Sequence, residues 1–129
     1  MSDSDKKSSA REFFRLGMKM PIKYRFAKKI ERGKYQVSKS FNGLGVEFGG
    51  GGLSFNAGKH LPIGTLTLLE MTFPFSRTPV MATGEVVHRE YAEHKGKKAS
   101  HLGIRFLLID DNERDKMVAF LISRGKTAP

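Results

Sequence analysis

Two arginines four positions apart are the residues best suited to hold an anionic ligand. Arg11 and Arg15 lie in the sequence REFFR. Residues four apart share one face of a helical turn, and in a curled segment they can still converge on one ligand. Two guanidinium groups can clamp a phosphate through paired hydrogen bonds and can stack on a purine ring, which two lysines cannot do. The same spacing arises readily by chance among 23 Lys and Arg residues, so its context decides its meaning.

Four consecutive glycines, Gly49 to Gly52, form a second unusual feature. A Walker A phosphate loop needs Gly-Lys-Ser/Thr at the start of a helix, whereas EFGGGGLSF leads into a predicted strand. One interpretation is a tight turn that uses residues able to adopt positive φ. A run of four exceeds the need of a simple turn. A close approach of the backbone to a planar or phosphate-bearing ligand is therefore the second interpretation.

No residue arrangement in the sequence predicts catalysis or a metal site. There are no cysteines, and the four histidines show no ligand spacing such as HExxH. We expect His94 in a lysine-rich turn and His88 and His101 on strands, where they could face each other. No serine lies in a G-x-S-x-G elbow. The sequence therefore predicts a protein that is not an enzyme and that has no catalytic residues, metal or cofactor.

Length and charge define the class of protein further. The chain has 129 residues, which suits one domain with a hydrophobic core, and its formal net charge is +10. Such a charge favours an anionic partner, which could be a nucleic acid, an acidic membrane surface, a nucleotide or an acidic protein face. The first ten residues are polar, so we expect a disordered tail over 1–10. No segment approaches the roughly 18 apolar residues that span a membrane, and we expect a cytoplasmic protein.

Alternation of apolar and polar residues predicts a chain made mainly of strands. The first strand is expected over 21–26, followed by a turn at Gly33 and by a hairpin at Asn42-Gly43. Further strands are predicted over 44–48, 52–57, 80–91 and 102–108, with a charged turn over 92–98. In the last strand, Leu102 and Leu108 are expected on one face, with Gly103 on the other.

One segment changes phase along its length. Leu66 and Leu68 are out of phase with Met71, so a bulge is predicted near Leu69 or Glu70.

Helical spacing replaces the alternation near the end of the chain. Met117, Phe120 and Leu121 follow a helical period, which predicts an amphipathic helix over about 111–124, and Gly125 provides a stop signal. The candidate N-caps are Asp110, Asp111 and Asn112. Together the patterns indicate six or seven antiparallel strands and one helix, a small barrel with a helix packed on an opening or edge.

The order of these segments resembles the PilZ domain family from about Arg11 to Arg124. The closest matches are the R-x-x-x-R segment before MPIKYRF and the later segments GGLSF, GEVV and LGIRF. The resemblance implies an all-β fold, a six-stranded antiparallel β-barrel with a C-terminal α-helix, within a domain over 11–125. It also implies binding of cyclic di-GMP between the arginine segment and the outer surface of the barrel.

The resemblance also implies the ligand-binding residues. Arg11 and Arg15 match the two motif arginines. The second family motif, Asp/Asn-x-Ser-x-x-Gly, aligns with Glu47 to Gly52, so that Gly49 replaces the serine and Gly52 matches the final glycine. The lost hydroxyl removes a hydrogen bond worth roughly 0.5–1.5 kcal/mol, and the binding is expected to be weaker for it. The expected ligand-binding set is Arg11, Arg15, Glu47, Gly49, Gly52 and Gly103.

The resemblance favours a cyclic-di-GMP receptor whose N-terminal arginine segment changes conformation on binding and signals to an unspecified protein partner. One alternative is a PilZ-fold protein-interaction module that has lost ligand binding, which the altered second motif supports. Another is a basic nucleic-acid-binding barrel, supported by the charge and by aromatic residues such as Tyr24 and Tyr35 near basic ones. No strand shows the solvent-facing aromatic cluster that such a surface needs, so nucleic acid is not favoured as a partner.

Overall fold

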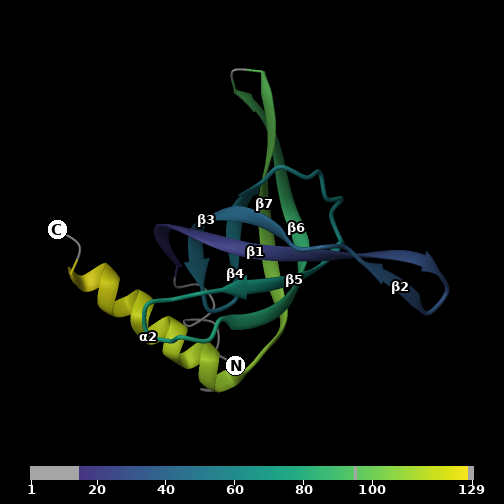
Figure 1. Ribbon diagram of the computed structural model, residues 1–129. Coiled ribbons are helices and arrows are strands. Elements are labelled where there is room, and N and C mark those ends of the chain that lie inside the picture. Colours follow the sequence, from purple (N-terminus) through teal and green to yellow (C-terminus); the bar gives the residue numbers. More distant parts are fainter. Residues whose placement is uncertain (1–14, 95, 128–129) are drawn as a thin grey trace, which may run out of the picture.

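The chain forms seven strands and one helix, shown in Figure 1. The structure is a computed structural model that describes residues 15–94 and 96–127. Arg11 and the predicted tail over 1–10 therefore lie outside the described residues. The elements are β1 (Arg15–Glu31), β2 (Lys34–Val37), β3 (Phe41–Gly49), β4 (Gly52–Ala57), β5 (Leu66–Met71), β6 (Val80–His94), β7 (Lys97–Ile109) and α2 (Asp111–Thr127).

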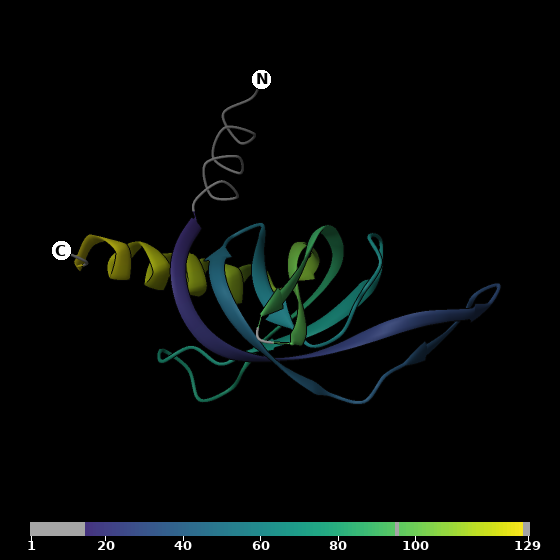
Figure 2. The same ribbon diagram turned by 90° about the horizontal axis from the view of Figure 1, so that it is seen from above.

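The strands form one antiparallel sheet that closes on itself. Its order is β2-β1-β3-β4-β7-β6-β5, and β1 also pairs with β5. This additional pairing joins six strands in a ring and leaves β2 outside it, where β2 and the end of β1 extend as an arm away from the barrel (Figure 2). The predicted fold, a six-stranded antiparallel barrel with a C-terminal helix, is confirmed.

The first strand is much longer than predicted, and the predicted hairpin at Asn42-Gly43 is wrong. Asn42 and Gly43 lie within β3 and pair with β1. The predicted turn at Gly33 is confirmed: the chain reverses there after β1, and the φ of Gly33 is 76°. The Asn-Gly pair does not mark a hairpin here, because the glycine is needed for packing against a neighbouring side chain. A Cβ atom on Gly43 would lie 2.8 Å from the Phe55 ring.

The predicted bulge in β5 is also wrong. The register of β5 with β1 and β6 is continuous from Leu66 to Met71. Leu69 and Met71 face the core together with Thr67, which has no exposed surface. Thr67 fits there because its hydroxyl donates a hydrogen bond to the Gly84 carbonyl at 3.2 Å. A satisfied buried threonine therefore completes the alternation that the leucines had obscured.

A bulge occurs in β7 instead. Gly84 pairs with Phe106 and Thr83 with Leu108, so Leu107 is the additional residue on β7. The bulge reverses the phase of the strand. Leu108 is consequently 71% exposed and Ile109 enters the core, contrary to the predicted inward position of Leu108.

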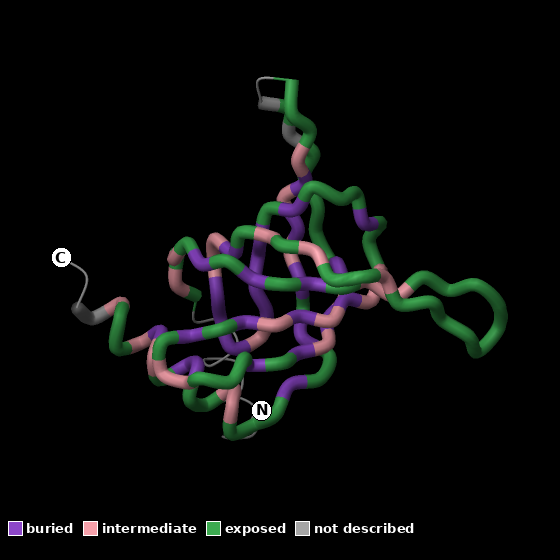
Figure 3. Tube along the Cα trace, in the orientation of Figure 1, coloured by how far each residue is buried: buried purple, intermediate pink, exposed green. Residues whose placement is uncertain are grey.

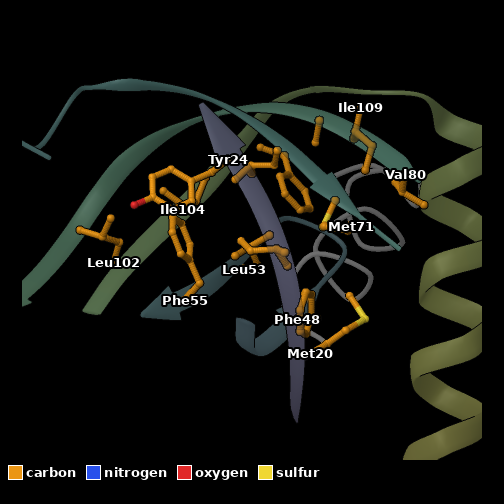
Figure 4. Close-up of a cluster of buried hydrophobic side chains, with 14 of the residues drawn as sticks. Met20, Tyr24, Phe48, Leu53, Phe55, Met71, Val80, Leu102, Ile104 and Ile109 are labelled. Atoms are coloured by element: carbon orange, nitrogen blue, oxygen red, sulfur yellow. The ribbon is translucent and has the colours of Figure 1, made fainter. Parts of the chain in front are cut away.

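Aromatic and aliphatic side chains fill the ring (Figure 4). Tyr24 is 1% exposed, and its ring centroid lies 4.9 Å from that of Phe55. Burial raises the pKa of Tyr24, although a hydrogen bond with the Lys59 backbone lowers it in part. Tyr24 is therefore a core residue and is not available to stack on a nucleic-acid base.

Helix α2 packs against β1 and β3. Its N-terminus is capped by Asp110, whose Oδ2 accepts a hydrogen bond from the Glu113 amide at 3.1 Å, as one of the predicted caps. Met117 and Leu121 are fully buried. The predicted stop at Gly125 is wrong, because the helix continues to Thr127. A glycine near a helix end costs only about 1 kcal/mol relative to alanine.

Candidate functional site

Four residues form a row across the outer face of the barrel. Glu47 on β3 pairs with Ser54 on β4, Ser54 pairs with Gly103 on β7, and Gly103 pairs with His88 on β6. The core residues Leu53 and Phe55 on either side of Ser54 point inward, so alternation turns Ser54 outward. The row therefore lies on the surface opposite the core.

A groove of about 790 Å³ follows this row, and we call it the outer-face groove. Its lining residues come from all four of these strands, from the start of β1 and from α2. They are Arg15, Glu47, Gly51, Ser54, Val87, His88, His101, Gly103, Ile104, Arg105, Phe106, Leu107 and Arg114. Three arginines and two histidines thus accompany a single glutamate, which suits an anionic ligand.

Arg15 lies at one end of the outer-face groove as the first residue of β1. Its Nη1 donates to Glu47 Oε1 at 3.1 Å, and both side chains are a little under half exposed, at 45% and 44%. An ion pair at such a site contributes about 0–1 kcal/mol. Arg15 can therefore exchange Glu47 for a ligand phosphate at small cost.

Gly52 is required by the approach of β4 to β7. A Cβ atom there would lie 2.0 Å from the Ile104 carbonyl oxygen, which no side chain allows. The preceding Gly51 carbonyl accepts a hydrogen bond from the Phe106 amide at 2.8 Å. Among the described glycines, positive φ occurs only at positions 33, 64 and 96. The glycine run is thus the tight turn between β3 and β4 that the first interpretation expected, but the turn does not use positive φ.

Gly103 leaves space at the middle of the row. A Cβ atom on Gly103 would lie 3.1 Å from the Cβ atom of His88. The missing side chain leaves the backbone open here, between Ser54 and His88, so a flat ligand group can approach β7 closely.

Ser54 is the residue that the sequence analysis missed at the floor of the groove. It is 9% exposed and lies opposite Glu47 in the ladder. The motif serine is replaced by Gly49, which does not line the groove, but Ser54 presents a hydroxyl there. The alternation of GLSF, with Leu53 and Phe55 inward, was a signal that could have identified it.

The histidines of the groove are diagonal neighbours and do not face each other. His88 lies opposite Gly103, and His101 lies opposite Glu90. His88 Nε2 is 3.1 Å from Glu90 Oε1, and His101 Nδ1 is 2.8 Å from Asn56 Oδ1. Both rings are thus oriented by polar neighbours on the same surface. Within the part of the chain that the structure describes, no three His, Asp or Glu side chains gather as a metal site.

Two more arginines were missed by the sequence analysis. Arg105, exposed on β7, forms an ion pair with Glu85 on β6. Arg114 reaches the groove from the first turns of α2, and its Nε is buried with no hydrogen-bond partner among the described residues. An unpaired buried guanidinium N–H is costly, and an anion in the groove can satisfy it. No local sequence pattern links a helix residue to the face of a strand, so this position needed the fold.

The sequence-predicted site residues divide into three groups. Arg15, Glu47 and Gly103 line the outer-face groove. Gly49 and Gly52 lie at the adjacent ends of β3 and β4 but do not line it. Arg11 lies outside the described residues. The groove combines guanidinium groups with a hydroxyl, a carboxylate and a stretch of open backbone, a set that fits a phosphate-bearing ligand with a planar base.

Comparison with known proteins agrees with this fold. The family model described as the PilZ domain matches residues 9–123. A search of curated protein sequences gives no match. None of the described helices is long and apolar enough to cross a membrane.

Three solved structures share the fold at low sequence identity. The inhibitor of motility MotI/DgrA from Bacillus subtilis superposes with a TM-score of 0.67 at 11% identity, over 92% of this chain and 52% of that one. The PilZ domain of YcgR from Escherichia coli, solved with c-di-GMP, gives 0.58 at 13% identity, over 90% and 92% of the two chains. MrkH from K. pneumonia in its apo state gives 0.61 at 14% identity, over 88% and 51%. The chain thus spans about half the length of MotI/DgrA and MrkH.

Proposed function

This chain belongs to the PilZ family, a non-catalytic family whose domains are typically cyclic-di-GMP receptors, and from that premise we propose that it binds cyclic di-GMP and signals to a protein partner. The observation that carries the proposal is the outer-face groove, where Arg15 meets the row of Glu47, Ser54, Gly103 and His88 on neighbouring strands. The PilZ domain of YcgR, which shares the fold, was solved with this ligand. The proposal includes a binding domain over 11–125 and a cytoplasmic location, where the nucleotide is found.

The roles of the residues follow from their chemistry. Arg15, together with Arg11, grips phosphate and guanine through paired hydrogen bonds and stacking. Glu47 orients Arg15 in the free protein and accepts hydrogen bonds from a guanine edge when Arg15 turns to the ligand. Gly49 and Gly52 act indirectly, at the turn that joins β3 and β4 beside the groove, and Gly103 provides the flat floor for a base.

The proposed signal is a change in the arginine segment. Binding fixes Arg11 and Arg15 on the barrel, which alters the shape and charge that a partner protein reads. Hydrogen bonds to a charged phosphate contribute about 1.5–3 kcal/mol each, more than the ion pair between Arg15 and Glu47 that they replace. The exchange is therefore favourable.

Isothermal titration calorimetry of the full chain with cyclic di-GMP tests the proposal. We expect saturable heat with protein and ligand at about 100 µM, well above a micromolar dissociation constant. Arg11→Ala should abolish that heat, while Lys7→Ala, the matched change within the tail, should preserve it. Absence of heat from the wild-type chain would refute the binding function.

Thermal unfolding separates the receptor from the alternative, a PilZ-fold interaction module without ligand. A ligand at 100 times its dissociation constant stabilises a protein by about 2.7 kcal/mol. The replacement of the motif serine by Gly49 is the observation that favours the alternative. Identical unfolding temperatures with and without the nucleotide would support the module.

A further inference from the structure

A second groove, distinct from the outer-face groove, lies beside the arm of β1 and β2. Its volume is about 680 Å³, and we call it the arm groove. One wall is the end of β1 with Tyr35 of β2, and the other is the loop over 59–65. The two grooves share no lining residue.

The arm groove lies where β1 lacks a neighbour. The pairing of β1 with β5 ends at Ala27 and Leu66, although β1 continues to Glu31. Beyond Ala27, the described strands pair with β1 on the β2 side only. An unpaired strand side offers backbone N–H and C=O groups to an added strand. The groove therefore has room and hydrogen-bonding groups for an extended segment that continues the line of β5.

The charge of the arm groove has one sign. Lys28, Lys29 and Lys59 line it, and none of the described residues that line it is acidic. The one acid of the neighbouring turn, Glu31, is already paired with Lys34 at 3.3 Å. A segment bound here is therefore expected to carry carboxylates.

Apolar surface is exposed at the same place. Every residue from Lys28 to Val37 is exposed, as Figure 3 shows for the whole arm. Tyr35 is 53% exposed and Ile63 on the opposite wall is 64% exposed. Pro62, the preceding residue of the loop, is exposed as well, whereas Leu61 is buried in the core. Contiguous exposed apolar surface rimmed by charge is typical of an interaction site.

We propose that the arm groove binds an extended, acidic segment of a partner protein, which adds as a strand along β1 at Lys28 and Lys29. Its carboxylates face Lys28 and Lys59, and its apolar side chains lie on the other face of the added strand, over Tyr35, the cross-strand partner of Lys29, and over Ile63. The inference deepens the proposed receptor function, because it gives the partner a surface and a chemistry, and rests on it only for the existence of a partner.

A peptide fits the arm groove better than a lipid surface does. The site is concave between two walls, whereas membrane insertion needs protruding apolar side chains. Lipid tails cannot satisfy the unpaired backbone groups of β1. An added strand satisfies these backbone groups with its own. Its alternating side chains place acidic groups on the face toward the basic surface of the groove and apolar groups on the face toward the apolar surface.

A titration followed by nuclear magnetic resonance tests the inference on the ligand-free, ¹⁵N-labelled full chain. The probe is a peptide of about ten residues that alternates glutamate with valine. Up to about 1 mM peptide should shift the amides of Ala27 to Lys29 and of the loop over 59–65 while leaving Ser54 and Gly103 unchanged. No shifts, or shifts spread over all basic residues, would overturn the proposal.

Charge reversal supplies a matched pair of variants. Lys28→Glu/Lys29→Glu should weaken peptide binding about tenfold, because the positive charge at this wall of the groove becomes negative and repels the carboxylates. Lys97→Glu/Lys98→Glu makes the same change in net charge on the β6–β7 hairpin and should bind as wild type. Equal weakening in both variants would show a non-specific charge effect and refute the site.

Two further experiments decide between a peptide and a membrane as the partner, and separate this inference from nucleotide binding. The first is sedimentation of the chain with phosphatidylglycerol vesicles. If the wild-type chain sediments with the vesicles, Lys28→Glu/Lys29→Glu does not, and the peptide causes no shifts, the arm binds a membrane and the peptide proposal is overturned. Calorimetry with cyclic di-GMP on Lys28→Glu/Lys29→Glu should match wild type, since the two grooves share no lining residue. A chain that binds peptide but no nucleotide would refute the receptor function alone.

Discussion

Replacing Gly52 by alanine tests whether the glycine run is a demand of barrel packing. The added Cβ atom would lie 2.0 Å from the Ile104 carbonyl oxygen. An ordinary C···O contact is about 3.3–3.6 Å, so β4 and β7 must separate by more than about 1 Å. The hydrogen bond from the Phe106 amide to the Gly51 carbonyl, 2.8 Å long, would then be lost.

The size of the effect follows from these two consequences. Overpacking of this kind costs about 1–3 kcal/mol, and the lost hydrogen bond adds about 0.5–1.5 kcal/mol. Gly52→Ala should therefore lower the free energy of unfolding by about 2–4 kcal/mol. For a domain of this size that corresponds to a fall in Tm on the order of 10 °C.

Urea and thermal unfolding followed by circular dichroism measure the change, and Gly58→Ala is the control. A Cβ atom on Gly58 meets nothing within 4 Å. Removal of a glycine from the unfolded chain should make that variant equal to or slightly more stable than wild type. If Gly52→Ala were as stable as Gly58→Ala, the steric account of the run would be refuted.

Three other substitutions probe the ligand groove, the core and the helix. Arg15→Ala should weaken cyclic-di-GMP binding about 10- to 100-fold by calorimetry, with Lys19→Ala on the same strand as an unaffected control; an unchanged dissociation constant would remove Arg15 from the site. Because the folded pKa of Tyr24 is raised, its contribution to stability is fully present below pH about 10 and is lost as the pH rises above that value. Tyr24→Phe should lack this loss in unfolding measured from pH 8 to about pH 11, and parallel profiles of the two proteins would contradict the assignment. Asp110→Ala should lower stability by about 1 kcal/mol in urea unfolding and Asp111→Ala by less; the reverse order would exclude Asp110 as the cap.

Much of the fold was predictable because it depends on alternation. The strand pattern, the helix and the resemblance to the PilZ family gave the correct barrel. The errors occurred where a single contact overrides a local signal. Gly43 lies under the Phe55 ring and is no turn, and Thr67 is buried because Gly84 accepts its hydroxyl hydrogen bond. The bulge at Leu107 exposes Leu108, and the alternation of residues in this strand gives no signal of that bulge.

The residues of the candidate site also divide into those that the sequence could identify and those that required the fold. Arg15 and Glu47 were identified from motif positions, and the structure adds the ion pair between them. Ser54 was within reach of period-two reasoning, since both of its neighbours are core residues. Arg114 was not, because its approach to the groove depends on how α2 packs on the barrel, a contact between segments distant in sequence.

The closure of the ring by β1 and β5 has a consequence for synthesis of the chain. On the ribosome, β1 can pair with β2 and β3 as soon as residue 49 has emerged, since both partners follow it closely. Its other side, from Ile22 to Ala27, must wait for Leu66 to Met71. Pairings distant in sequence form slowly, so the nascent chain exposes an open sheet edge during this interval. We expect ring closure to be the step at which newly made protein is most prone to aggregate.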